Sequence, residues 1–254
     1  MIEIVENQSE PLELCAADKI VIAPGKSAVL VERSLNGECT VEVGENARLR
    51  HYRLHCSGES VLAATVAARA SYELTTLHLG GGGTHVRMDL TGAEARCRSD
   101  AVYAVSGAEQ ARLSSDIRHS ADDTFSAQLV KGIAADGAKA SFEGSILIPP
   151  GRRGIDGAQQ HRALLLSPAA EIRAVPKLEI YSDDVKCAHG SAIGALNELH
   201  LFYLRTRGIP EPQAREILIA AFLNEVLDEI TDEQIRAEFR NRVAEQCRFS
   251  GAEA

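Results

Sequence analysis

Short runs of apolar residues, mostly alternating with polar ones, fill the first three quarters of the chain. Val41–Val43, Leu178–Tyr181 and the more apolar Ser145–Ile148 are examples, and turn-forming Gly, Ser, Asn or Asp residues lie beside them. Alternation with a period of two is typical of strands that bury one face. No stretch from about Leu12 to Asp184 shows sustained helical periodicity, so we predict β-structure throughout this region.

A weak sequence repeat runs through this β-region. Four stretches combine a turn residue, a small alanine and an apolar residue between polar ones, namely Gly44–Arg50, Gly92–Arg98, Gly137–Glu143 and Ser167–Arg173. Their first residues are 48, 45 and 30 positions apart, close to multiples of about 15, as expected for strands at matching corners of a coil. The repeat favours a β-helix, a solenoid of stacked strands, over the alternative of a β-sandwich. The inward-facing apolar residues would then be Leu49, Cys97, Phe142 and Ile172.

The hydrophobic pattern becomes helical after Gly194. Apolar residues at helical spacing run up to Gly208 and Pro210, a combination that ends a helix. Residues 211–230 predict a second, long helix whose apolar residues occupy more than one side. A helix of this kind must be buried on more than one side.

Thr231 and Gln234 match a capping box and predict the start of a last helix. Three such helices bury little surface on their own, so we expect them to pack on the β-core or on a partner. The mainly-β chain is therefore predicted to consist of a β-helix core, residues 1–190, and a C-terminal α-helical subdomain, residues 191–254.

Composition narrows the function classes. The chain has 254 residues with 27 basic and 36 acidic side chains, and the net charge of −9 is spread along it, so we expect no nucleic-acid partner. No apolar run approaches the ~20 residues that cross a bilayer, and the first residues lack a signal-peptide layout, so we expect no membrane partner and a cytoplasmic location. The six cysteines are scattered without a C-x-x-C pair, which argues against a disulfide framework.

Cys187 and His189 form the sharpest candidate for chemistry. If Val185–His189 is a strand, both side chains point to the same face, because side chains alternate along a strand. A thiolate and an imidazole are ligands for iron, for zinc or for a sulfur-bridged cluster. Two ligands do not complete a site, so the others would come from elsewhere in the chain or from a partner. On spacing alone, a structural Cys and His is the simpler interpretation.

Other groups give weaker indications. His51 and His55 would share a strand face, either as a metal pair or as polar positions of a sheet.

The run Gly80–Gly83 lacks the Lys-Ser/Thr of a phosphate-binding loop, so we expect this chain not to hydrolyse ATP. Two pairs of adjacent aspartates would suit a β-helix enzyme acting on carbohydrate, but the chain contains no Trp to stack against sugar rings.

Three linked motifs carry a resemblance to a known family. They read LLLSPAAEI at residues 164–172, PKLEIYSDDVKCAHG at residues 176–190 and LFYLRTRGIP at residues 201–210. Together they resemble the SufB/SufD family of iron–sulfur cluster assembly proteins, and SufD most closely. The resemblance is dense over residues 159–230. In the preceding part it is limited to the general pattern of short strands and turns.

The chain also departs from the family pattern. Leu204 stands where SufB proteins carry a cysteine, so the chain looks SufD-like and lacks that cluster thiol. His161 replaces an Asn that is usual in the segment before LLLS. We further expect the chain to be short at its N-terminal side, without the helical domain that usually precedes the β-core in SufD proteins.

The resemblance implies a parallel β-helix core and a non-catalytic scaffold subunit of a cytosolic iron–sulfur cluster assembly complex. It places Cys187 and His189 at the interface with a SufB-like subunit, or with a second copy of the chain in isolation, where a transient iron–sulfur cluster would be shared. A SufC-like ABC ATPase, which would carry the ATPase activity, is expected to dock on the C-terminal helices. The residues expected to contribute are Arg207, Gly208, Ile209, Pro210, Ile219, Phe222 and Leu223. The alternatives are a β-helix carbohydrate-active enzyme and a self-assembling structural solenoid.

Overall fold

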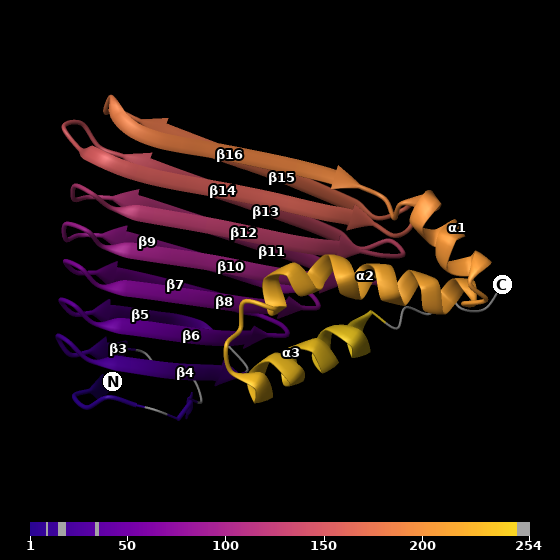
Figure 1. The fold of residues 1–254 in the computed structure, drawn as a ribbon, viewed down its shortest axis with the longest axis horizontal. Helices are drawn as coiled ribbons and strands as arrows, with labels where there is room; N and C mark the ends of the chain where they lie inside the picture. Colours follow the sequence, from indigo (N-terminus) through magenta and orange to yellow (C-terminus); the bar gives the residue numbers. More distant parts are fainter. Residues whose placement is uncertain (9, 15–18, 34–35, 248–254) are drawn as a thin grey trace.

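Two parallel sheets coil around one core in the computed structural model, which describes residues 1–8, 10–14, 19–33 and 36–247 (Figure 1). Sheet A contains β1 (Ile2–Ile4), β3 (Lys19–Ile22), β5 (Gly37–Val43), β7 (Glu59–Val66), β9 (Gly82–Leu90), β11 (Gln110–His119), β13 (Lys139–Ile148) and β15 (Glu171–Ile180). Sheet B contains β2 (Leu12–Leu14), β4 (Ser27–Arg33), β6 (Arg48–His55), β8 (Ser71–Leu79), β10 (Arg96–Val105), β12 (Phe125–Ala134), β14 (Arg153–Leu165) and β16 (Asp184–Gly194).

Successive strands alternate between the two sheets, and the neighbours within each sheet are parallel. This topology confirms the predicted β-helix. Each coil contains one strand of each sheet and lengthens along the chain: the paired residues Arg50 and Glu73 are 23 positions apart, whereas Gln128 and Gln159 are 31 apart. A spacing of about 15 residues thus corresponds to half a coil, which explains the weak repeat.

The inward-facing register is confirmed for the repeat, with one local difference. Phe142 is 1% exposed, and Leu49 and Cys97 are equally buried between the sheets. Ile172, however, pairs with Ala140 rather than with Phe142. The alignment of the Gly137 and Ser167 repeats is thus shifted by two residues relative to the strand pairing. A shift of two residues leaves each side chain on its predicted face, because side chains alternate with a period of two.

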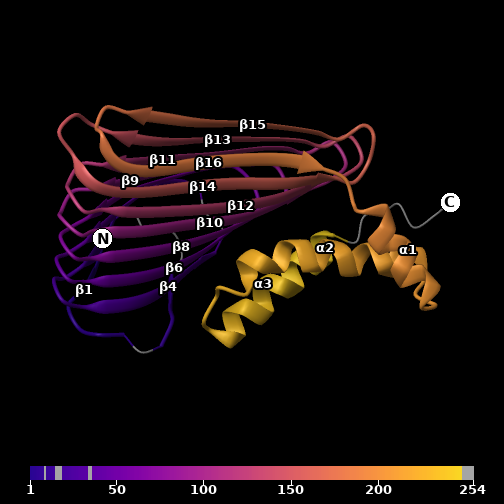
Figure 2. The same ribbon diagram turned by 45° about the horizontal axis from the view of Figure 1, so that its top comes forward.

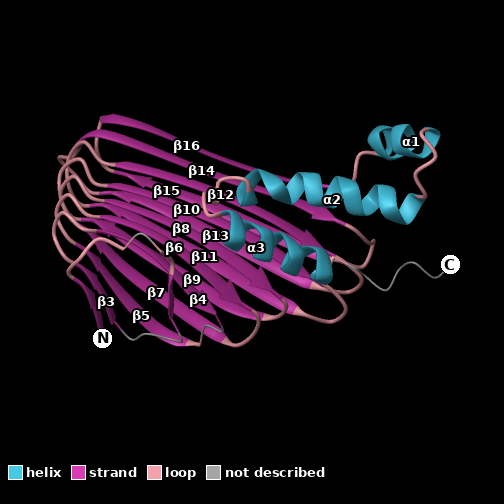
Figure 3. Ribbon diagram, turned by 60° about the horizontal axis from the view of Figure 1, so that its bottom comes forward, coloured by secondary structure: helices cyan, strands magenta, loops and turns pink. Residues whose placement is uncertain are grey.

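Three helices follow the β-helix: α1 (Glu198–Thr206), α2 (Glu211–Leu227) and α3 (Glu233–Gln246). α2 and α3 lie along the outer face of sheet B, and α1 projects beyond the strand ends (Figures 2 and 3). Leu223 of α2 and Phe239 of α3 are buried against outward-facing residues of sheet B, and the Phe239 ring meets Tyr52 edge to face at 6.4 Å. Full burial of one such side chain contributes about 1.5–3 kcal/mol. No helix in the described residues is long and apolar enough to cross a membrane.

Polar contacts fix the helices in place. The ammonium of Lys131, which is buried on β12, donates to the Phe222 carbonyl at 2.8 Å, pairs with Glu225 and lies over the Phe222 ring. Arg33 of β4 donates to both carboxylate oxygens of Glu238 on α3. A buried cation is stable only when it is paired in this way, so these contacts also fix the position of α2.

The start of α3 corrects one prediction. The N-cap is Asp232, whose carboxylate accepts from the backbone N–H groups of Gln234 and Ile235 at 2.9 Å. Thr231, the predicted cap, instead accepts a hydrogen bond from Arg50. Asp232 has the extended backbone of a cap and a longer acidic side chain, and an anion is favoured at a helix N-terminus.

Candidate functional site

The last coil of the β-helix, formed by β15 and β16 and called the end coil below, is open on one side. β15 and β16 are the final strands of their sheets, and each pairs with only one neighbour (Figure 1). β16 is a strand over the motif that contains Cys187 and His189, so both residues lie in the inward-facing column. No further coil covers them in the described structure.

Cys187 is half-buried above the preceding coil. It pairs with Gly157, and its Sγ is 3.3 Å from the point that a Cβ at Gly157 would occupy. The Ser126 hydroxyl and His119 Nε2 lie 3.4 and 3.6 Å from the same point. Gly157 therefore lets the thiol settle close to two buried polar groups of the coils below.

The thiol of Cys187 is held in its neutral form. Burial raises its pKa, the backbone N–H of Gly157 lowers it, and the Asp156 carboxylate raises it, with a net increase. A thiol in this environment is a poor nucleophile and becomes a good ligand only when a cation stabilises the thiolate.

His189 is exposed and lies directly above Gln159 in the register of β14 and β16. A shallow cavity of about 340 Å³ opens beside it, lined by residues of these two strands. Gln159 is 1% exposed, and its Oε1 has no hydrogen-bond partner among the described residues. The imidazole thus stands at the mouth of a cavity whose floor is polar.

His161 lines this cavity and is held by contacts with three other residues, and sequence reasoning did not assign it to the site. Its Nδ1 is 3.2 Å from the Ser191 hydroxyl and its Nε2 is 3.0 Å from the Tyr103 hydroxyl, while its ring stacks on Phe142 at 5.1 Å. Burial lowers the pKa of His161 to about 4, so the ring is neutral at pH 7. The alternation of side chains could have found it, because His161 lies two residues after Gln159 and therefore faces the same side of β14.

The structure keeps the weaker histidine pair apart from the end coil. His51 and His55 both point into the core from β6, as their spacing predicted, and both are fully buried. His51 contacts the Tyr72 hydroxyl at 2.9 Å and Glu32 at 3.1 Å, and the His55 ring lies 4.6 Å from that of His78. No group of three or more potential ligands in the described residues is arranged to hold a metal ion.

The seven residues predicted to bind an ATPase fall into two groups. Four form the turn between α1 and α2: Arg207, Gly208, Ile209 and Pro210. Gly208 has a φ of 83°, which favours glycine, and Arg207 stacks on the ring of Tyr203. The other three lie on α2, where Ile219 and Leu223 are buried towards sheet B and Phe222 is half-buried.

The most exposed apolar side chains of the three helices lie on α1. Leu199, Phe202 and Tyr203 are 71%, 64% and 56% exposed, and only Leu201 of this helix is buried. Three large apolar side chains on two adjacent turns form a surface that water solvates poorly. Sequence reasoning placed the docking surface on α2 and on the turn from Arg207 to Pro210. On α2, Ile219 and Leu223 are buried towards sheet B, whereas Ile217 is 41% exposed.

The fold and the open end coil define a parallel β-helix that carries a soft-ligand pair at an unpaired sheet edge. The family model described as the SufBD core domain of SUF system FeS cluster assembly matches residues 14–222. The chain belongs to this SufBD family.

Individual relatives agree with the family match. An iron–sulfur cluster assembly SufBD family protein of Synechocystis is 33% identical over 215 residues, which cover 82% of this chain and 47% of the relative. The iron–sulfur cluster assembly protein SufD of Escherichia coli is 29% identical over 244 residues, covering 89% and 57%. Protein ABCI7, chloroplastic, of Arabidopsis thaliana is 33% identical over 213 residues, covering 80% and 44%. The chain spans about half the length of the curated relatives it matches.

Proposed function

We propose that this chain is a non-catalytic scaffold subunit in iron–sulfur cluster assembly, and that it acts through its end coil. One observation carries the proposal: the soft ligands Cys187 and His189 lie in the inward-facing column of a strand whose outer edge pairs with no other described strand. Membership of the SufBD family supports it. The carbohydrate-active and self-assembling alternatives gain no support from this family.

The end coil has the properties of an interface with a SufB-like subunit. β15 contains Pro176, which has no N–H and therefore leaves a gap among the donors of that strand. β16 has no proline from Asp184 to Gly194, so it is the better edge for an added strand. A second copy of the chain presents the same edge, which would account for a homodimer in isolation.

The iron–sulfur cluster would be the cargo of this interface rather than a resident cofactor. Cys187 and His189 supply a thiol and an imidazole, which suits iron, but the chain offers no third ligand beside them in the described residues. The partner would therefore provide the remaining ligands. A cluster shared across an interface is released when the two subunits separate, as a transient assembly site requires.

A SufC-like ATPase would dock on the exposed apolar surface of α1 and on the turn from Arg207 to Pro210. Phe222, Ile219 and Leu223 contribute from beneath by holding α2 on sheet B. We further propose a cytoplasmic location and keep the division into residues 1–190 and 191–254 as a hypothesis.

Co-expression with a SufB-like and a SufC-like subunit tests the proposal. The chain should purify as a stable complex with both, and Ile193→Asp should remove the SufB-like subunit, because it places a charge in the inward column of the end coil. Val5→Asp, at an exposed apolar position far from the end coil, is the matched control. Loss of the SufB-like subunit from both variants, or from neither, would reject the end coil as the interface.

A further inference from the structure

A basic groove lies on the outer face of sheet B, several coils away from the end coil. It has a volume of about 720 Å³ and is lined by β4, β6, β8, β10 and the turns before them. Four of its residues are arginines and two are glutamates, so its lining is positive although the chain carries a net charge of −9. The arginines are Arg48, Arg50, Arg69 and Arg96.

Two of these arginines are placed on either side of a serine. Arg48 of β6 and Arg96 of β10 both pair with Ser71 of β8, and Ser27 of β4 pairs with Arg48. Neighbouring strands are about 4.8 Å apart, so the two arginine backbones are about 10 Å apart. The short side chain of Ser71 leaves the space between them open to a ligand.

The same two arginines lack a carboxylate partner among the described residues. Arg50 is paired with Glu73 at 3.0 Å, and Arg69 is held by Asn46 at 2.9 Å. Arg96 instead lies over the ring of Phe125 at 5.6 Å, which limits the directions its guanidinium can take. Glu94 also lines the groove, and its carboxylate forms no salt bridge within the described residues.

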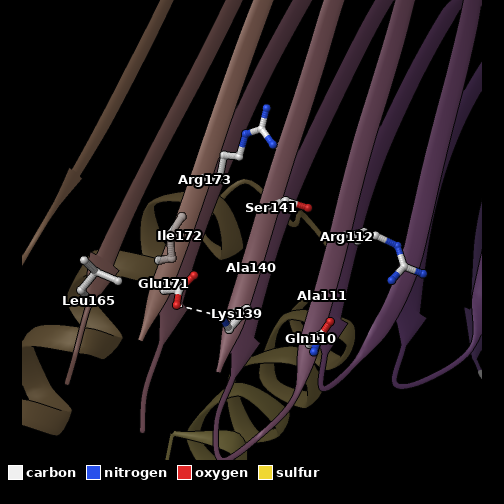
Figure 4. A pocket seen from close by; sticks show the side chains of 10 residues that line it. All are labelled: Gln110, Ala111, Arg112, Lys139, Ala140, Ser141, Leu165, Glu171, Ile172 and Arg173. Atoms are coloured by element: carbon white, nitrogen blue, oxygen red, sulfur yellow. Dashed lines mark hydrogen bonds and ion pairs between the residues drawn. The ribbon is translucent and has the colours of Figure 1, made fainter. Parts of the chain in front are cut away.

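Sheet A carries a matching arrangement that differs in one respect. Arg112, Ser141 and Arg173 are in register on β11, β13 and β15, and they line a groove of about 540 Å³ (Figure 4). There Arg112 is paired with Glu59, and Lys139 is paired with Glu171 at 2.8 Å. Its cations are thus largely neutralised, and the sheet A groove is a natural control for the sheet B groove.

We propose that the sheet B groove binds a soluble phosphate ester or diphosphate between Arg48 and Arg96. The guanidinium group matches phosphate oxygens in pairs, and the Ser71 hydroxyl adds a hydrogen-bond donor at the centre. A diphosphate has oxygens that face both arginines at once. The site is independent of the end coil, so it neither requires nor tests the role in cluster assembly.

Isothermal titration of the full chain with inorganic pyrophosphate tests this site. At low ionic strength we expect saturable binding with one site per chain, which weakens as NaCl is added because the contacts are exposed. Arg48→Gln with Arg96→Gln should weaken binding at least tenfold, and Ser71→Asp should abolish it. The control variants are Arg112→Gln with Arg173→Gln, and Ser141→Asp, which should bind as the unmodified chain does. Circular dichroism confirms that each variant is folded.

Three results would overturn the proposal. The first is no saturable heat with pyrophosphate up to about 1 mM, a limit that corresponds to about −4 kcal/mol of binding. The second is equal weakening in the sheet A and sheet B variants, which would mean non-specific attraction. The third is binding to vesicles of phosphatidylglycerol without binding to pyrophosphate, which would assign the groove to a lipid surface.

Discussion

His51 and His189 occupy the same inward-facing column of sheet B, His51 within the stack of coils and His189 at its end. His51 is enclosed by coils on both sides, where Tyr72 and Glu32 contact its ring. His189 has a coil beneath it and none above in the described part of the chain. An inward polar residue is thus structural where a neighbouring coil satisfies it, and it remains available where the stack ends.

The enclosed region depends on its own charges. Glu32 and Arg53 are both almost fully buried and form a salt bridge of 2.8 Å beside His51. A buried charge is tolerated because its partner lies in the adjacent coil. Removing a partner there should damage the fold, whereas removing a group at the end coil should damage only what the end coil binds.

The largest effect is expected for Arg53→Met, which leaves the Glu32 carboxylate buried beside His51. We expect the free energy of unfolding to fall by about 3–5 kcal/mol, measured by urea denaturation. Arg50→Met breaks the exposed pair with Glu73 and should lower the free energy of unfolding by no more than about 1 kcal/mol. Equal effects of the two substitutions would show that burial does not decide the role of these charges.

The pH dependence of stability tests the contribution of the buried Glu32 carboxylate separately. Burial raises the pKa of Glu32, but hydrogen bonds and positive charges from His51 and Arg53 outweigh it, and the pKa falls from 4.5 to about 2. Because the folded state holds this proton less tightly than the unfolded one, the stabilisation is present above about pH 4.5 and is lost as the pH falls towards 2. It amounts to about 3 kcal/mol.

The matched variant for this titration is Glu32→Gln. Its free energy of unfolding should vary less between pH 5 and pH 3 than that of the unmodified chain, as followed by urea denaturation at each pH. An unchanged pH dependence would assign the acid sensitivity to other groups, such as buried His161 and His119, whose pKa values burial lowers to about 4.

The alternation of polar and apolar residues predicted β-structure. The weak repeat, together with the family resemblance, predicted the β-helix, and the repeat gave the inward positions of Leu49, Cys97 and Phe142. The alternation did not predict the outer face of sheet B, because Tyr52 and Leu54 face outward and are nevertheless buried by the helices. A strand covered on both faces loses the alternation that would reveal its orientation.

The candidate site was predicted only in part. The one-residue spacing of Cys187 and His189 fixes their shared face, since neighbouring side chains of a strand always alternate. The cavity beside them was not predictable, because Tyr103 and Phe142 reach His161 from other coils and from both sheets. Contacts across coils depend on the length of each coil, and this length changes along the chain.

A smaller effect is expected at α1, which takes no part in the stack of coils. Phe202→Asp should weaken binding of a SufC-like ATPase by about 10- to 100-fold, on the scale of an exposed aromatic contact. The thermal midpoint of the isolated chain should not change, because this ring is exposed. Binding is measured by titration with the purified ATPase. Undiminished affinity would move the docking surface away from α1.

The smallest effect on stability is expected at the end coil itself. His189→Ala should change the free energy of unfolding by no more than about 0.5 kcal/mol, because an exposed side chain contributes little packing. Urea denaturation of the isolated chain measures this directly. A loss of several kcal/mol would instead give His189 the structural role of His51.

The most direct test of the account is the iron and sulfide content of the complex reconstituted with a SufB-like and a SufC-like subunit. The double substitution Cys187→Ala and His189→Ala should lower both contents at equal yield of complex. Lys186→Ala, which removes an exposed side chain from the opposite face of β16, should leave them unchanged. Unchanged iron and sulfide in the double variant, at equal complex yield, would contradict the assignment of the end coil to cluster assembly.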